Sequence, residues 1–248
     1  MMESHAIPAV LALAAVLIAT YTDLRERIIP NWLTVSFTAA GIAFHGFLGA
    51  FQGDLFVAVS GALGASISFA IGYVLWRAGG WAGGDVKLFT ALGSLLFNYK
   101  MPAGNPIYPV PLTILFNGIV AAAPFLFIYV LILRSRRQGV LFARVRVGDL
   151  KEGMIPAEAV FERNGTVYRS SVLPNTGHRI KIYANPKRME GLTVYQIRAL
   201  KRLFRERKID GTIRIKRCLP FAPVLAAGTL ITVLYGDLYW LFLTGVLA

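Results

Sequence analysis

Long apolar runs dominate this sequence and constrain its fold more than any other feature. A run of about 20 apolar residues is long enough to cross the hydrocarbon core of a bilayer. Apolar residues make up 56% of the chain, and its mean hydropathy of +0.57 is unusual for a soluble domain. We therefore expect a multi-pass membrane protein. Six spans are predicted, at about residues 7–22, 32–51, 55–76, 84–97, 112–133 and 220–235.

The fourth predicted span is short, and the course of the chain after the sixth is open. Residues 238–248 form a further apolar tail, which either extends the last helix or lies in the membrane interface. The predicted fold is a membrane all-α protein, a six-transmembrane-helix bundle with a small α+β domain inserted before the last helix. The predicted domains are residues 1–133, 134–217 and 218–248.

The inserted domain is polar and strongly basic. Residues 134–217 hold 21 of the chain's 26 Lys and Arg residues. Residues 192–208 form one amphipathic helix, with a capping box at Thr193 and Gln196 and with Gly211 just past its end. Alternating apolar and polar residues predict strands at 140–147, 167–171, 179–183 and 212–215.

The orientation follows from the basic residues, which favour the cytoplasmic side of a membrane. With six spans, Arg25, Arg27, Arg77 and residues 134–217 fall on one side, and Lys100 falls on the other. The sequence therefore predicts a multi-pass protein of the cell membrane whose inserted domain is cytoplasmic.

Two aspartates lie at the cytoplasmic ends of predicted spans. Asp23 closes the first apolar run, and Asp85 opens the fourth within a glycine-rich stretch, residues 79–89. A carboxylate at the mouth of a hydrophobic helix is costly unless it caps, pairs or reacts. Two carboxylates at the same depth would share one proton, because both cannot ionise cheaply at close range.

Such a pair can hydrolyse a peptide bond without a metal or a covalent intermediate. The ionised member takes a proton from water, while the protonated member polarises the scissile carbonyl. The pair titrates as a unit, so the base is assigned to neither residue. Gly83 and Gly84 lack Cβ atoms and leave room for a substrate backbone. The single cysteine, Cys218, excludes a CxxC metal site, and no metal is expected.

Two segments resemble the signatures of the type IV prepilin peptidases. Residues 23–34, read DLRERIIPNWLT, resemble the first signature, and residues 84–88, read GDVKL, resemble the second, GxGD. The paired cysteines of the bacterial members are absent. The basic domain and residues 220–223, read PFAP, are more similar to the archaeal preflagellin peptidases.

This resemblance implies an aspartic endopeptidase that works at the inner membrane face without a cofactor. Members of the family remove a short basic leader from membrane-inserted pilin-like or flagellin precursors, cutting just before a hydrophobic helix. Asp23 and Asp85 match the two catalytic aspartates of the family. One position departs from the pattern: Ala82 stands where the family has glycine, and it would cost about 1 kcal/mol if that position needs φ > 0.

Other functions stay open on the sequence alone. Both aspartates could simply cap neighbouring helix ends, as aspartate often does. A proton- or cation-coupled transporter would use Asp23, Asp85 and His45 as a path, although both acids lie at one surface. A membrane-anchored scaffold would depend on the basic domain instead. Lys87 is predicted to be a snorkelling anchor.

Two further predictions concern the partner of the basic domain and the movement of the two aspartates. The domain is expected to bind anionic lipid headgroups, because each basic residue near such a surface contributes about 1 kcal/mol. Nucleic acid is not an expected partner, because the sequence has no zinc-finger or aromatic RNP pattern. Glycine-rich segments join the helices that carry Asp23 and Asp85, so we expect substrate to close an initially open pair.

Overall fold

The computed structural model describes residues 3–135, 142–174, 180–186, 191–216 and 220–247. The chain divides into two compact units. The first is made of Met1–Phe127 and Pro220–Ala248, and the second of Ile128–Leu219. The first unit is helical, and the described residues of the second form the end of a helix that begins in the first unit, short strands and an amphipathic helix.

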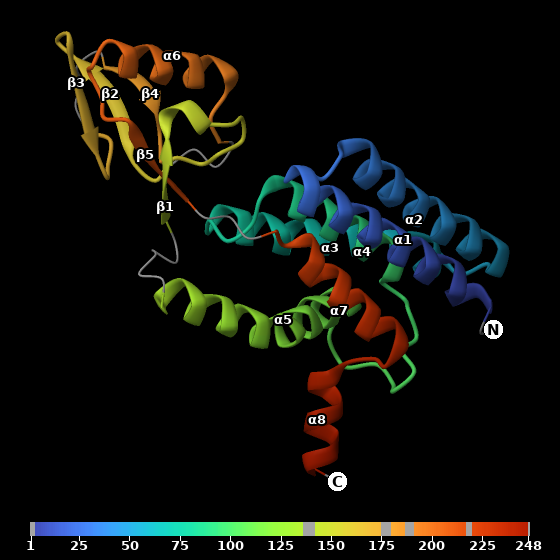
Figure 1. Ribbon diagram of the computed structural model, residues 1–248. Coiled ribbons are helices and arrows are strands. Elements are labelled where there is room, and N and C mark those ends of the chain that lie inside the picture. The colour runs from blue at the N-terminus through green and yellow to red at the C-terminus, as the bar shows by residue number, and fades with distance from the viewer. Residues whose placement is uncertain (1–2, 136–141, 175–179, 187–190, 217–219, 248) are drawn as a thin grey trace. The chain divides into compact units, whose positions relative to one another are not determined.

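The first unit is a bundle of helices, shown in Figure 1. Their bounds are α1 Glu3–Glu26, α2 Asn31–Gln52, α3 Leu55–Arg77, α4 Gly83–Leu96, α5 Val110–Ser135, α7 Ala222–Leu234 and α8 Leu238–Leu247. Four segments of the described chain are long and apolar enough to cross a membrane, namely Ala6–Glu26, Asn31–Gln52, Leu55–Arg77 and Val110–Ser135. Helices α4 and α7 have only 14 and 13 residues, so the count of six spans stays a prediction.

Helix α4 is the most deeply buried helix of the bundle core. Its side chains Leu88, Phe89 and Leu92 have no exposed surface, and α1, α2 and α3 all pack against it. Small residues allow this approach, since a Cβ built on Gly93 would lie 1.9 Å from the hydroxyl oxygen of Ser68 in α3. At 1.5 Å per residue, α4 spans only about 21 Å, which is less than a hydrocarbon core of about 30 Å. A membrane crossing at this position would therefore need residues beyond the ends of α4.

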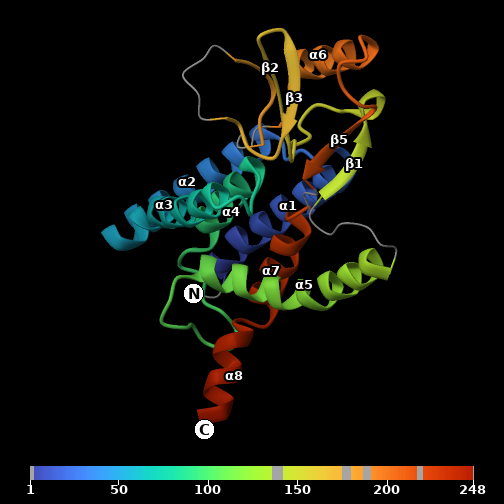
Figure 2. The same ribbon diagram turned by 90° about the vertical axis from the view of Figure 1, so that its left-hand side faces the viewer.

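Helices α5 and α7 cross, as Figures 1 and 2 show from two sides, and a glycine makes the contact between them close. A Cβ built on Gly228 of α7 would lie 2.0 Å from the carbonyl oxygen of Ile114 in α5. Beyond the end of α7, the fully buried Asp237 accepts hydrogen bonds from the hydroxyls of Tyr108 and Thr113, both at 2.6 Å. These bonds hold the end of α7 against the start of α5.

The tail after α7 forms a helix of its own. Gly236 has φ 107°, which interrupts the helix, and Asp237 Oδ1 accepts the N–H of Trp240 at 2.8 Å, which starts α8. The sequence left open whether residues 238–248 extend the last helix or lie in the membrane interface. The structure shows that the tail does not continue α7 as one uninterrupted helix.

The second unit combines two small antiparallel sheets with one face of α6. The bounds are β1 Phe142–Arg146, the 3-10 turn η1 Val147–Asp149, β2 Ala159–Arg163, β3 Thr166–Ser170, β4 Lys181–Ala184, α6 Val194–Arg205 and β5 Thr212–Lys216. Strand β1 pairs with β5, and β2 lies between β3 and β4. The apolar side chains Ile197, Leu200 and Leu203 of α6 form a core with Val160 and Ile213, and Figure 2 shows α6 alongside the strands.

The end of α6 differs from the prediction, although its start is confirmed. Thr193 and Gln196 form the expected reciprocal capping box, with bonds of 3.0 and 3.3 Å. The helix ends at Arg205, and the left-handed residue beyond it is Arg207, with φ 55°. The N–H of Lys208 then returns to the carbonyl of Leu203, which closes a Schellman turn. The assignment of Gly211 to this end was therefore wrong.

Candidate active site

Asp23 lies near the end of α1, on the stripe of that helix that faces the bundle. The stripe repeats every three or four residues through Ala12, Val16 and Ala19, all of which are buried. Asp23 itself is 8% exposed. Its Oδ2 atom accepts the backbone N–H of Ala222, the first residue of α7, at 3.3 Å. The start of a helix favours negative charge, because its first N–H groups have no partner within the helix.

The turn after Asp23 brings the chain back to α4. Arg27 ends α1 in the left-handed conformation, with φ 59°, and its N–H returns to the Asp23 carbonyl at 3.0 Å. Two residues later, Ile29 is buried. A Cβ built on Gly84 would lie 3.2 Å from the Cβ of Ile29. The segment that follows Asp23 therefore packs directly on the residue that precedes Asp85.

Asp85 lies in the first turn of α4 and is 6% exposed. Its Oδ2 atom accepts the N–H of Ala82 at 3.0 Å. Ala82 has φ −86° and ψ 160°, an extended conformation that any residue adopts. The departure from glycine at this position therefore causes no backbone strain.

The fold brings the two aspartates to the same end of the first unit, although 62 positions separate Asp23 from Asp85 in the sequence. Helices α1 and α4 pack against each other, and the two carboxyl groups are near enough to interact electrostatically. Each carboxylate is oriented by one backbone N–H at the start of a helix. The fold thus gathers two buried carboxyl groups at one end of the bundle.

The two glycines beside Asp85 have different surroundings. Gly83 is exposed, and a Cβ built there would meet no heavy atom within 4 Å. Gly84 is half-buried, and the space left by its missing Cβ is used by Ile29 of the same chain. Only Gly83 therefore presents open space at the start of α4.

Two other residues of the signatures form a contact with each other. The Nζ of Lys87 donates to the Oδ1 of Asn31, the first residue of α2, at 2.7 Å. His45 is buried in the middle of α2, with its Nδ1 atom 2.9 Å from the Gly41 carbonyl of the same helix. Cys218 lies outside the described residues, among which no group of three or more His, Cys, Asp or Glu side chains could hold a metal.

An apolar groove of about 350 Å³ lies elsewhere on the first unit, over α2, α3 and α4. Neither Asp23 nor Asp85 lines it, so the groove is not where the two acids would act. It is lined by Thr34, Val35, Thr38, Ala39, Ile42, Phe69, Lys87 and Thr90.

The contact that Asp23 makes with the start of α7 was missed in the sequence. The segment 220–223 was noted for its resemblance alone, and the bond from Ala222 to Asp23 was not foreseen. Pro223 in the first turn of α7 was the available signal, because proline favours the start of a helix. Fold and site together define a multi-pass helical membrane protein with a buried carboxylate pair at one end of its bundle.

Comparison with known proteins finds two family models that are similar to parts of this chain. Residues 10–132 match the model of the Type IV leader peptidase family, and residues 119–215 match the Archaeal Peptidase A24 C-terminal Domain. The two matches overlap and together cover residues 10–215, so the chain is similar to this class of peptidases over most of its length.

Curated relatives from three archaea are similar to parts of the chain. The prepilin peptidase EppA of Methanothermobacter thermautotrophicus is 40% identical over 139 residues, 51% of this chain and 36% of that protein. The preflagellin peptidase of Methanocaldococcus jannaschii is 32% identical over 91 residues, 37% of this chain and 38% of that protein. That of Methanococcus voltae is 27% identical over 119 residues, 44% of this chain and 51% of that protein. The chain thus spans between about a third and a half of the length of each relative.

Proposed function

We propose that this protein is a membrane aspartic endopeptidase whose catalytic pair is Asp23 and Asp85. Its substrates are membrane-inserted pilin-like or flagellin precursors, from which it removes the short basic leader. The observation that carries the proposal is that the packed helices α1 and α4 bury two carboxyl groups at one end of the bundle, each bound to an N–H at the start of a helix. The similarity to a leader peptidase family and the names of the three relatives support it. They favour a peptidase over the transporter that the sequence left open.

The proposed reaction needs only the two acids and water. One carboxylate takes a proton from water, whose oxygen attacks the scissile carbonyl carbon. The other carboxyl group donates a hydrogen bond and then its proton to the carbonyl oxygen. The C–N bond of the resulting intermediate breaks as the amine leaves with a proton returned by the pair. Because the pair titrates as a unit, neither acid is assigned the role of base.

The proposed membrane topology has six spans, α1 to α5 and α7, with the acids at the cytoplasmic face. Arg25 and Arg77 lie in the last turns of α1 and α3, and Arg27 directly follows α1. Basic residues favour the cytoplasmic side. The same rule places residues 134–217 in the cytoplasm. A bond that precedes a hydrophobic helix lies at the edge of the bilayer, which is where this topology puts the start of α4.

Gly83 is the proposed point of approach for the substrate backbone, with Gly84 behind it. The open space beside Gly83 leaves room for a peptide next to Asp85. In this proposal substrate binding also draws the two acids into hydrogen-bond reach of one water molecule.

The test is cleavage of a membrane-inserted precursor by the purified protein in nanodiscs. Asp23→Asn and Asp85→Asn are expected to lose activity by about 10³-fold, the scale of general acid–base catalysis. Asp54→Asn is the matched control, because the exposed Asp54 also binds N–H groups at a helix start, those of Phe56 and Val57. Wild-type rates from either of the first two variants would refute the proposed catalytic pair.

Anionic lipid is the proposed partner of the second unit. Tyr195, Arg198, Arg202 and Arg205 form an exposed stripe along α6, and each basic residue near an anionic surface contributes about 1 kcal/mol. Hydrogen exchange of α6 should slow in nanodiscs with anionic lipid and not in neutral ones. The double variant Arg198→Glu/Arg205→Glu should abolish the difference, whereas Lys151→Glu, outside the stripe, should keep it. Equal exchange in both lipids would contradict this proposal.

A further inference from the structure

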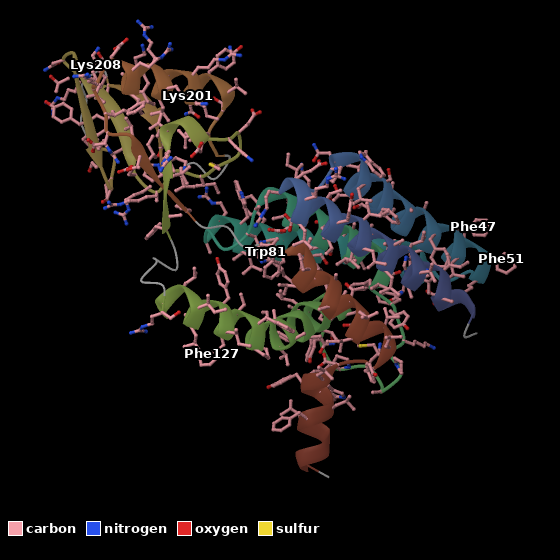
Figure 3. The ribbon with its side chains drawn as sticks, in the orientation of Figure 1. Phe47, Phe51, Trp81, Phe127, Lys201 and Lys208 are labelled. Carbon is pink, nitrogen blue, oxygen red and sulfur yellow. The ribbon has the colours of Figure 1, made fainter. Side chains whose placement is uncertain are left out.

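Two aromatic rings meet beside the aspartate pair. Trp81, in the loop before α4, is 6% exposed, and Figure 3 shows it next to the start of α7. Its ring centroid lies 5.0 Å from that of Phe221 and 5.3 Å from that of Phe89 in α4. Phe221 and Trp81 are 140 positions apart in the sequence, and their contact ties the start of α7 to the start of α4.

Each of these two rings adjoins an amide that binds one of the acids. Trp81 precedes Ala82, whose N–H is bound by Asp85. Phe221 precedes Ala222, whose N–H is bound by Asp23. A displacement of one ring against the other therefore moves one amide donor against the other, and the carboxylates follow their donors.

Trp81 is the more firmly held of the two rings. It packs edge-on against Phe89, and a Cβ built on Gly72 of α3 would lie 3.3 Å from it. Phe221 is half-buried and stands immediately before α7. The position of Phe221 on Trp81 is thus suited to set where α7 begins relative to α4.

We propose that the contact between Trp81 and Phe221 positions Asp23 against Asp85 for the reaction. The inference rests on the proposed function, because it assigns a role to these rings only through the aspartate pair. Neither ring is a catalytic residue. They act through the Ala82 and Ala222 amides, which fix the separation of the two carboxyl groups.

The first arm of the test measures catalysis by full-length protein in nanodiscs. Phe221→Leu should lower kcat by about 10-fold, since small misplacements of reacting groups are costly, and should leave KM near its wild-type value. Phe221→Tyr keeps the aromatic ring and should have a kcat close to that of the wild-type protein. In the double variant Trp81→Leu/Phe221→Leu, kcat should fall no further than in the more impaired of the two single variants, because both changes break the same contact.

The second arm does not depend on activity. In protein with ¹³C-labelled aspartate carboxyl groups, the Asp23 and Asp85 signals should titrate in two steps, assigned through the asparagine variants. A wider separation weakens the coupling, so the two steps should draw together in Phe221→Leu. Phe116→Leu is the matched control, because Phe116 also contacts two rings, those of Tyr108 and Tyr239, and should leave the titration unchanged.

The outcomes separate the two proposals. If Phe221→Leu lowers only thermal stability, with kcat and the titration steps unchanged, the rings merely pack and the inference is overturned. If the asparagine variants cleave the precursor normally, the proposed function fails, and the titration of Phe221→Leu still decides whether the rings position the acids.

Discussion

Replacing Gly83 by alanine is expected to stabilise the protein and to slow its proposed reaction. Gly83 is the first residue of α4, and a Cβ built there would meet no heavy atom within 4 Å. Alanine favours a helix over glycine by about 0.5–1 kcal/mol. The melting temperature should therefore rise by about 2–4 °C, the shift expected for about 1 kcal/mol in a protein of this size.

The same methyl group would occupy the space through which the substrate backbone reaches Asp85. A misplacement of about 1 Å can lower a rate by about 10²-fold, so kcat/KM for precursor cleavage should fall by about 10- to 100-fold. Stability and activity would then change in opposite directions, which a simple folding defect cannot produce.

Gly84→Ala is the matched control for this experiment. Its Cβ would lie 3.2 Å from the Cβ of Ile29, so Ile29 must move and the gain in helix propensity is offset. Its melting temperature should stay level or fall. Thermal unfolding and precursor cleavage are measured for both variants in the same detergent. Wild-type cleavage by Gly83→Ala would refute the role of Gly83, and a lowered melting temperature would refute the description of its surroundings.

Three further predictions address the rest of the molecule. Asp237→Asn should weaken the bonds from Tyr108 and Thr113 and cost about 1.5–3 kcal/mol of stability, while calorimetry with an activity assay finds kcat per folded molecule unchanged. Arg207→Gly should add about 1 kcal/mol to the stability of the second unit in urea unfolding, because its φ of 55° strains a non-glycine residue, whereas Lys208→Gly should add nothing. Burial and the hydrogen bond to Glu162 raise the pKa of Tyr183 to about 12. Above about pH 10 the Tyr183 hydroxyl loses its proton in the unfolded chain but keeps it in the folded chain. The stability that Tyr183 contributes is therefore fully present below about pH 10 and should be lost between about pH 10 and 12. Urea unfolding across that range should show a smaller fall for Tyr183→Phe.

Much of the first unit could be predicted because its signals are local. Apolar runs mark the helices whatever they pack against, and charges mark their ends. Asp23 and Asp85 could be placed at one end of the bundle because the number of intervening helices fixes the side on which each run ends. The exact bounds depend on capping, as at Arg207, where a left-handed arginine does what glycine was expected to do.

Features that depend on distant contacts could not be predicted. Strand β2 was missed because Ala159, Val160 and Phe161 are all buried, so the alternation typical of a half-exposed strand is absent. The contact of Trp81 with Phe221 joins residues that are 140 positions apart, and no local pattern encodes it. The same holds for the bond from Ala222 to Asp23.

Capping and catalysis are not competing explanations of the two aspartates. Asp54 shows what a cap alone requires: it is exposed and binds two N–H groups at the start of α3. Asp23 and Asp85 each bind one such N–H, yet both are buried and within electrostatic reach of each other. Burying two interacting acids lowers stability, and capping does not require it. The N–H bonds orient the carboxylates, and their shared burial is the feature that capping leaves unexplained and the proposed proton transfer requires.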